Sequence, residues 1–182
     1  RSGDVAGKHH PERAVLVPHV ATVAENGLRN NAGTLVMLES THSPGTTRQV
    51  VAPILNRHDE LGETVAIGYS PERIDPGNEV YGLSNITKVT SGIDRQSAAL
   101  TQLFYSQIID EVRPATSMEA AEATKLLENT FRFINITFAQ EFDEYFAHIG
   151  VSARETTELP ATKPFALRPF ISGAGIGWPV TA

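Results

Sequence analysis

A lysine and an asparagine four residues apart are the side chains of this sequence best suited to catalysis. Lys125 and Asn129 lie in a stretch without Gly or Pro, and a helix would place both on one face. An ammonium and an amide directed at one point suit a developing alkoxide or oxyanion, because they stabilise its charge. The alternative is an exposed lysine that pairs with Glu122 or Glu128.

Three further polar residues follow apolar runs that are typical of strands. Glu72 comes after one such run and a Ser-Pro turn, so its carboxylate is expected at the carboxyl edge of a sheet, where open α/β folds bind ligands. The alternative for Glu72 is a solvated ion pair with Arg73. Ser40 and Thr41 end another run at the same edge, where the alternative is ordinary turn and cap chemistry.

The elements that position these residues follow from hydrophobic periodicity. Helical spacing, with Thr46 or Thr47 as a candidate cap, and short apolar runs predict helices at about 18–29, 46–57 and 94–105 and strands at 34–38, 64–69, 86–90 and 108–112. Strands that alternate with helices predict an α/β fold. Specifically, we expect the second half of a doubly wound, mainly parallel sheet, followed by a long-helix α-helical dimerisation region.

That long helix is expected to begin at a capping box. Thr116 and Glu119 form the box, and neither Gly nor Pro follows until Gly150. Apolar residues three and four apart form a stripe along the helix, namely Leu127, Phe131, Ile134, Phe138, Phe142, Tyr145 and Ile149. Because other faces are apolar too, the helix must be buried on several sides. We expect a homodimer through residues 117–149, and the alternative is a core helix of a monomer.

These patterns divide the chain into four predicted regions. They are a flexible arm at 1–13, a partial Rossmann-like α/β region at 14–114, a helical spine at 115–160 and a Gly/Pro-rich tail at 161–182. The spine includes a short second helix at 152–159, capped by Ser152 and expected to stop before Pro160.

Composition excludes several classes of function. A net charge of -6 without a basic cluster argues against a nucleic-acid partner. No apolar run is long enough to span a membrane, and no secretory signal is visible at the start. The chain has no cysteine, and its six histidines, including His9 and His10, show no ligand spacing, so no metal is expected. These features fit a cytoplasmic protein.

Three segments together carry a family resemblance. Residues 38–47 (LESTHSPGTT), 69–78 (YSPERIDPGN) and 123–130 (ATKLLENT) resemble the UDP-glucose/GDP-mannose dehydrogenase family in order and spacing. The likeness is closest to the branch that acts on UDP-N-acetylhexosamines. Residues 161–165 and 173–177 extend it, so that it covers roughly residues 15–177. The resemblance implies an NAD-dependent, four-electron oxidation of a sugar C6 alcohol to a carboxylate, through a thioester, in polysaccharide biosynthesis.

The resemblance also implies roles for matching positions. Lys125 and Asn129 would stabilise an oxyanion, Glu72 would act as a base or orient water, and Thr41 would act beside Ser40 near the nicotinamide of NAD. The nucleotide sugar, a UDP-sugar, would be bound by Gly173, Gly175, Gly177 and Phe165.

Departures from the family pattern limit what this polypeptide is expected to do. It has no cysteine and no glycine-rich phosphate cradle before residue 33, and we expect the UDP-binding C-terminal domain of the family to be absent. Without a thiolate no thioester forms. We therefore expect a fragment or divergent member that is inactive in the full reaction as it stands, with NAD binding implied by resemblance alone. The alternatives are a non-catalytic dimerising module and an enzyme repurposed for thiol-independent carbonyl or proton-transfer chemistry at Lys125, Asn129 and Glu72.

Overall fold

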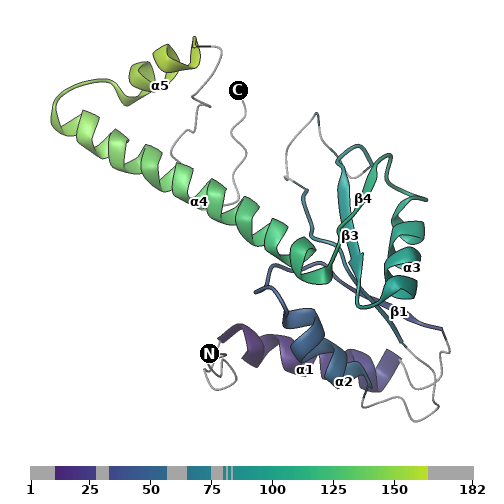
Figure 1. Ribbon diagram of the computed structural model, residues 1–182. Helices are drawn as coiled ribbons and strands as arrows, with labels where there is room; N and C mark the ends of the chain where they lie inside the picture. The colour runs from purple at the N-terminus through teal and green to yellow at the C-terminus, as the bar shows by residue number, and fades with distance from the viewer. Residues whose placement is uncertain are drawn as a thin grey trace, which may run out of the picture. The chain divides into compact units, whose positions relative to one another are not determined.

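The computed structural model describes residues 11–27, 33–56, 65–74, 80, 82 and 84–163 (Figure 1). The chain divides into two compact units. The first unit comprises residues 1–72 and 84–125, and the second comprises residues 73–83 and 126–182. Most of the predicted tail and most of the predicted arm lie outside the described residues.

A four-stranded sheet forms the centre of the first unit. Its strands, in spatial order, are β1 (Leu35–Leu38), β2 (Ala66–Tyr69), β3 (Lys88–Gly92) and β4 (Val112–Pro114). The pairs β1–β2 and β3–β4 are parallel, and β2–β3 is antiparallel. This mostly parallel sheet confirms the predicted α/β fold. The antiparallel step brings the start of β3 to the same edge as the carboxyl ends of β1 and β2.

The predicted last strand is present but lies later than 108–112, since β4 runs from Val112 to Pro114. The backbone N–H groups of Ile108 and Ile109 both donate to the carbonyl of Tyr105. Residues 106–109 therefore form a turn that ends the preceding helix. Pairing with β3 begins only at Val112. The apolar run at 108–109 therefore reflects a helix end and not a strand.

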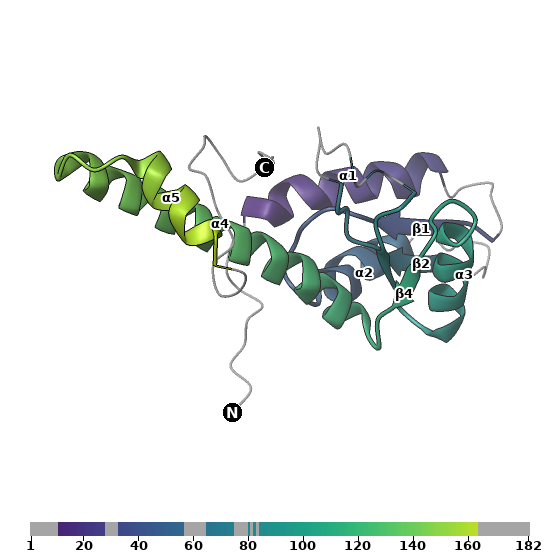
Figure 2. The same ribbon diagram turned by 90° about the horizontal axis from the view of Figure 1, so that it is seen from above.

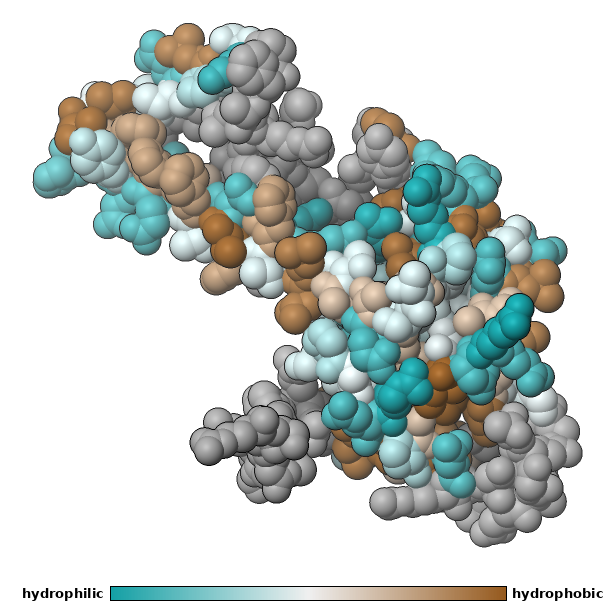
Figure 3. Space-filling model, in the orientation of Figure 1, coloured by the Kyte–Doolittle hydropathy of each residue, from teal (hydrophilic) through white to brown (hydrophobic). Residues whose placement is uncertain are grey.

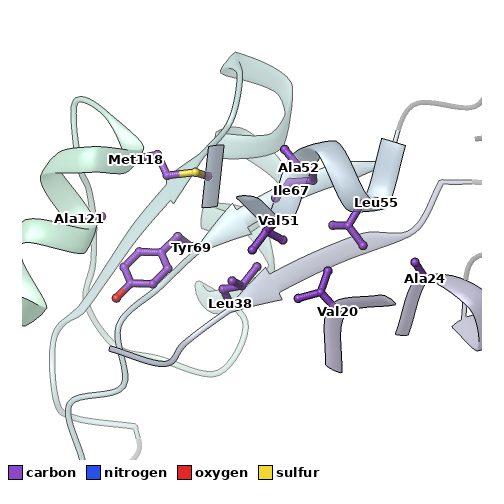
Figure 4. Close-up of a cluster of buried hydrophobic side chains, with 10 residues drawn as sticks. All are labelled: Val20, Ala24, Leu38, Val51, Ala52, Leu55, Ile67, Tyr69, Met118 and Ala121. Carbon is purple, nitrogen blue, oxygen red and sulfur yellow. The ribbon is translucent and has the colours of Figure 1, made fainter. Parts of the chain in front are cut away.

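Helices cover both faces of the sheet (Figures 1 and 2). Alternate residues of a strand point to opposite faces. Ile67 and Tyr69 of β2 point into the main hydrophobic cluster (Figure 4). Gly68, between them, lies against Thr101 of the helix on the other face, where a Cβ would overlap the threonine hydroxyl.

The two layers of helices are defined by these contacts. The cluster face is covered by α1 (Pro11–Gly27), the π-helix η1 (Thr47–Val51) and α2 (Ala52–Asn56), and the other face by α3 (Arg95–Tyr105). The first helix begins seven residues before the predicted 18–29, inside the expected arm, and accommodates Pro18 within it. The first turns of α4 (Met118–His148) contribute Met118 and Ala121 to the cluster.

The long helix is confirmed, with a different cap. It has 31 residues, and the hydroxyl of Ser117 accepts the backbone N–H of Ala120 at 3.1 Å. Glu119 pairs with Arg48 at 2.7 Å. The predicted capping box is therefore wrong: the capping residue is Ser117 and not Thr116. Glu119, the predicted second member of the box, instead pairs with Arg48.

The end of the long helix follows the sequence pattern. Gly150 has a left-handed φ of 73°, a conformation that glycine adopts without strain and that commonly ends helices. The side chain of Ser152 then caps α5 (Ala153–Ala161), as predicted. Pro160 lies inside α5, so the predicted stop before this proline is wrong.

Asp94 caps α3, and its removal is expected to destabilise the first unit. Its carboxylate accepts the backbone N–H of Ser97 at 2.7 Å, and this bond is the main cause that lowers the pKa of Asp94. Asp94→Ala should lower the free energy of unfolding by about 1 kcal/mol, whereas Asp94→Asn keeps an acceptor and should lose less.

The pH dependence checks this prediction. Because the folded-state pKa is depressed, the stabilisation is full above the unfolded value of 3.8 and is lost as the pH falls below it. Urea unfolding of Asp94→Ala and wild type should therefore converge in acid. If the free energies of unfolding of wild type and Asp94→Ala differ by the same amount at neutral and acid pH, the predicted role of the Asp94 carboxylate is contradicted.

Candidate active site at the carboxyl edge of the sheet

Lys125 and Glu72 are brought together at the carboxyl edge of β2. The Lys125 Nζ donates a hydrogen bond to the main-chain carbonyl of Glu72, across 53 residues of sequence. Both residues are half-buried. The structure thus places the ammonium and the carboxylate residue suggested by the sequence next to each other within one unit.

The other polar residues considered near Lys125 lie along α4. Asn129 follows four residues later on the same helix and therefore shares its face, and it belongs to the second unit. Glu128 forms an ion pair with Arg73 at 2.7 Å, so Arg73 has a carboxylate partner on α4.

Lys88 is a deeply buried charge at this edge. Its side chain is 3% exposed, and its Nζ lies 3.0 Å from Oε1 of Glu39 and 3.1 Å from Oε2 of Glu72. The register of β2 with β3, continued from the pair Tyr69–Ser91, sets Lys88 across from Glu72. No role was expected for Lys88, although a lysine inside a strand pattern is a signal of a buried ion pair.

Glu39 and Tyr105 complete this cluster. The Tyr105 hydroxyl donates to Oε1 of Glu39 at 2.5 Å, and the Lys88 Nζ lies 5.0 Å from the Tyr105 ring centre. Burial, followed by the hydrogen bond to Glu39 and its charge, raises the pKa of Tyr105 far above its ordinary value of 10.0. Tyr105 therefore keeps its proton and acts as a donor to Glu39.

Glu39→Gln should lower the pKa of Tyr105, because it removes both the accepting carboxylate and its negative charge. A spectrophotometric titration of the tyrosines should show one of the four ionising at lower pH than in wild type. Glu111→Gln, which removes an exposed carboxylate bound to Thr87 and Arg113, should leave the curve unchanged. Identical curves for wild type and Glu39→Gln would contradict the proposed contact.

Ser40 and Thr41 follow β1 at the same edge. Both are exposed, and the Ser40 carbonyl accepts a hydrogen bond from the Tyr69 hydroxyl at 3.3 Å. The β1–β2 pairing continues into this region, where the Glu72 N–H donates to the Glu39 carbonyl at 3.2 Å. The two exposed hydroxyl residues are therefore displayed on an anchored backbone, where a ligand can reach them.

Glu122 anchors the turn that follows Thr41. Its side chain is fully buried and accepts hydrogen bonds from the backbone N–H of Gly45, the backbone N–H of Thr47 at 2.9 Å and the Thr47 hydroxyl at 2.6 Å. It also lies 3.4 Å from Nδ1 of His42. The alternative of an exposed Lys125 paired with Glu122 is wrong, because Lys125 is half-buried and the Glu122 carboxylate is buried among these donors.

This arrangement also corrects the predicted cap of the helix after the turn. Thr46 makes no cap hydrogen bond, and its hydroxyl donates to the Ser43 carbonyl at 2.7 Å. Glu122 takes the cap's place at the start of η1, where the helix dipole favours a negative charge. Two residues of α4 therefore contact this edge of the sheet: Glu122 binds the turn at Gly45 and Thr47, and Lys125 binds the Glu72 carbonyl.

The remaining predictions are only partly within the described residues. Phe165, Gly173, Gly175 and Gly177 lie outside them. Within the described ranges, no group of three or more His, Asp or Glu residues is arranged to hold a metal ion. No helix in those same ranges is both long and apolar enough to cross a membrane.

Comparison with known proteins places this edge in a family context. Two models match the chain: the UDP-glucose/GDP-mannose dehydrogenase family NAD binding domain at residues 14–109, and the central domain of that family at residues 119–179. The chain is 36% identical over 151 residues to UDP-N-acetyl-D-glucosamine 6-dehydrogenase of Salmonella typhi, covering 81% of this chain and 36% of that protein.

Two further relatives agree with these matches. UDP-N-acetyl-D-mannosamine dehydrogenase of Methanococcus aeolicus is 31% identical, with 97% of this chain and 44% of that protein covered. The solved structure of UDP-D-ManNAc dehydrogenase from Pyrococcus horikoshii is 32% identical with a TM-score of 0.75, covering 89% of this chain and 38% of that one. The chain thus spans less than half the length of these relatives.

The NAD-binding-domain match alone covers 96 of the 182 residues, since it runs from 14 to 109, and the central-domain match covers most of the remainder. This chain therefore belongs to the UDP-glucose/GDP-mannose dehydrogenase family.

Proposed function

We propose that this chain supplies part of the active site of an NAD-dependent UDP-sugar 6-dehydrogenase, which oxidises the C6 alcohol of the sugar to a carboxylate. The observation that carries the proposal is the contact between Lys125 and the Glu72 carbonyl at the carboxyl edge of the sheet. The names of the relatives support a UDP-N-acetylhexosamine as the substrate class.

Each proposed role rests on the chemistry of the side chain. The Lys125 ammonium would stabilise the negative charge that develops on the C6 oxygen, together with the Asn129 amide on the same helix face. The Glu72 carboxylate would accept a proton or orient a water. The exposed Ser40 and Thr41 fit the nicotinamide end of NAD, because they stand where open α/β sheets bind ligands. NAD, when bound, accepts the hydride.

The 182-residue polypeptide alone is proposed to be inactive in the complete oxidation. It contains no cysteine, so it has no thiolate to hold the aldehyde through the second oxidation. Incubation of the chain with NAD and a UDP-N-acetylhexosamine should form no NADH. Sustained NADH formation by the chain alone would contradict this part of the proposal.

A chimera tests the active-site roles. In the Pyrococcus horikoshii relative, the segment that matches this chain would be replaced by this chain's residues, with the host supplying the rest. The chimera should form NADH with a UDP-N-acetylhexosamine. A folded chimera that binds NAD and UDP-sugar but forms no NADH would contradict the proposed roles and favour a non-catalytic module.

A second copy of this chain is proposed as the partner of α4. The seven stripe residues are between 41% and 70% exposed in the single chain, and contiguous exposed apolar side chains often mark interaction surfaces. Figure 3 shows apolar side chains following one another along this helix. Off the stripe the exposure varies, since Ile136 is 8% exposed and Phe133 is 52% exposed. A long stripe on one helix suits two-fold pairing, in which the same surface serves both copies.

Replacing Phe138 with Glu should convert the dimer to a monomer. Phe138 is 55% exposed and contacts Phe142 with ring centres 4.6 Å apart, so a charge there would be buried in the middle of the proposed interface. Analytical ultracentrifugation should show a wild-type dimer and a Phe138→Glu monomer, with Gln140→Glu, an exposed polar position two residues away, remaining dimeric. A wild-type monomer at micromolar concentration would rule out the interface.

A further inference from the structure

Lys88 joins the two carboxylates at the edge of the sheet, and this arrangement suggests a role beyond packing. We propose that Lys88 is a positioning residue, which fixes the orientation of the Glu72 carboxylate, while Glu39 and Tyr105 hold Lys88 in place. This inference rests on the proposed function, in which Glu72 acts as a base or orients water.

The burial pattern supports this division of roles. The Lys88 side chain is 3% exposed, whereas those of Glu72 and Glu39 are 41% and 46% exposed. A buried ammonium requires carboxylate partners, because an unpaired charge is costly to remove from water. Lys88 approaches Glu72 at Oε2 from inside the protein, and the carboxylate remains accessible to a ligand from outside.

Other charged residues named at this site have contacts of their own. Glu39, after β1, also accepts from the Tyr105 hydroxyl of α3, so it is held independently of Lys88. Lys125 of α4 donates to the main-chain carbonyl of Glu72 and not to its carboxylate in this contact. The neighbouring Arg73 forms its ion pair with Glu128. Lys88 is therefore a cation that the structure places directly on the Glu72 carboxylate, 3.1 Å from Oε2.

Two substitutions should move the titration of Glu72 in opposite directions. Lys88→Met removes the ammonium and should raise the midpoint of the Glu72 carboxyl titration by about 1 pH unit or more. Glu39→Gln removes the competing carboxylate and should lower that midpoint, because Lys88 then serves Glu72 alone. A purely structural role for Lys88 predicts no such pair of opposite shifts.

Nuclear magnetic resonance of the full chain, labelled with carbon-13 at the glutamate carboxyls, measures this midpoint, with Glu72→Gln assigning the signal. Lys88→Arg should restore the wild-type value in large part. Arg48→Met removes a cation that pairs with Glu119 and the Ile93 carbonyl, at the opposite end of β3 from Lys88, and should leave the midpoint unchanged.

An unchanged Glu72 midpoint in folded Lys88→Met would overturn the inference. If Lys88→Met fails to fold, Glu39→Gln provides the test. A Glu72 midpoint that stays constant or rises in Glu39→Gln would also overturn the inference. The titration needs neither sugar nor NAD. It can therefore fail while the chimera forms NADH, or succeed while the chimera does not, so the two proposals are tested separately.

Discussion

Glu122→Ala should lower the free energy of unfolding by about 3–5 kcal/mol, the cost expected when one partner of a buried ionic network is removed. The substitution deprives three donors of their acceptor: the Gly45 N–H, the Thr47 N–H and the Thr47 hydroxyl. Each buried donor left unsatisfied costs about 1–3 kcal/mol. Urea unfolding followed by circular dichroism measures the loss, and Glu122→Gln, which keeps one acceptor oxygen, should lose less.

Glu119→Ala provides the matched control for that experiment. Glu119 lies one helical turn earlier on α4 and pairs with Arg48, but the two side chains are 40% and 45% exposed. An exposed pair of this kind contributes about 0–1 kcal/mol. Equal losses in Glu122→Ala and Glu119→Ala would show that the turn at 42–47 does not depend on the buried carboxylate.

Lys125→Met in the chimera should lower kcat by about 10²–10³-fold, the usual loss when one donor to a developing oxyanion is removed. The ammonium is half-buried beside Glu72, where partial exclusion of water strengthens its effect on a nearby charge. Initial rates of NADH formation at varied UDP-sugar concentration measure the change. Arg154→Met, at an 87% exposed position paired with Glu158, should keep the activity of the chimera.

The distribution of the loss between kcat and KM distinguishes the proposed role from simple binding. A residue that acts on the transition state lowers kcat and kcat/KM equally, whereas one that only binds substrate raises KM with kcat unchanged. A Lys125→Met chimera with unchanged kcat and a raised KM would therefore contradict the oxyanion role.

Local patterns were sufficient to predict most of the secondary structure. Short apolar runs predicted β1, β2 and β3, and helical spacing predicted α3. The stretch without Gly or Pro predicted α4 and its end at Gly150. The antiparallel step between β2 and β3 was not predictable in this way, because strand direction depends on the path of the connecting segment and not on side-chain periodicity.

Long-range contacts explain what the sequence patterns missed in the site. Glu122 reaches Thr47 across 75 residues, and Lys88 reaches Glu39 across 49. The sequence shows that both side chains carry a charge. Only the packing of the first turns of α4 within the first unit and the pairing of β3 within the sheet show that these charges are buried and paired. Lys125 and Glu72 were expected together only because both belong to motifs of one family resemblance.

Transfer of deuterium tests the central proposal most directly. The chimera would be incubated with NAD and a UDP-N-acetylhexosamine that carries deuterium at C6, and the NADH formed would be analysed by mass spectrometry. If residues of this chain complete a UDP-sugar 6-dehydrogenase site, the NADH should carry deuterium, and Lys125→Met should slow its appearance. NADH without deuterium, or none from a folded chimera that binds both NAD and the UDP-sugar, would contradict the proposed function.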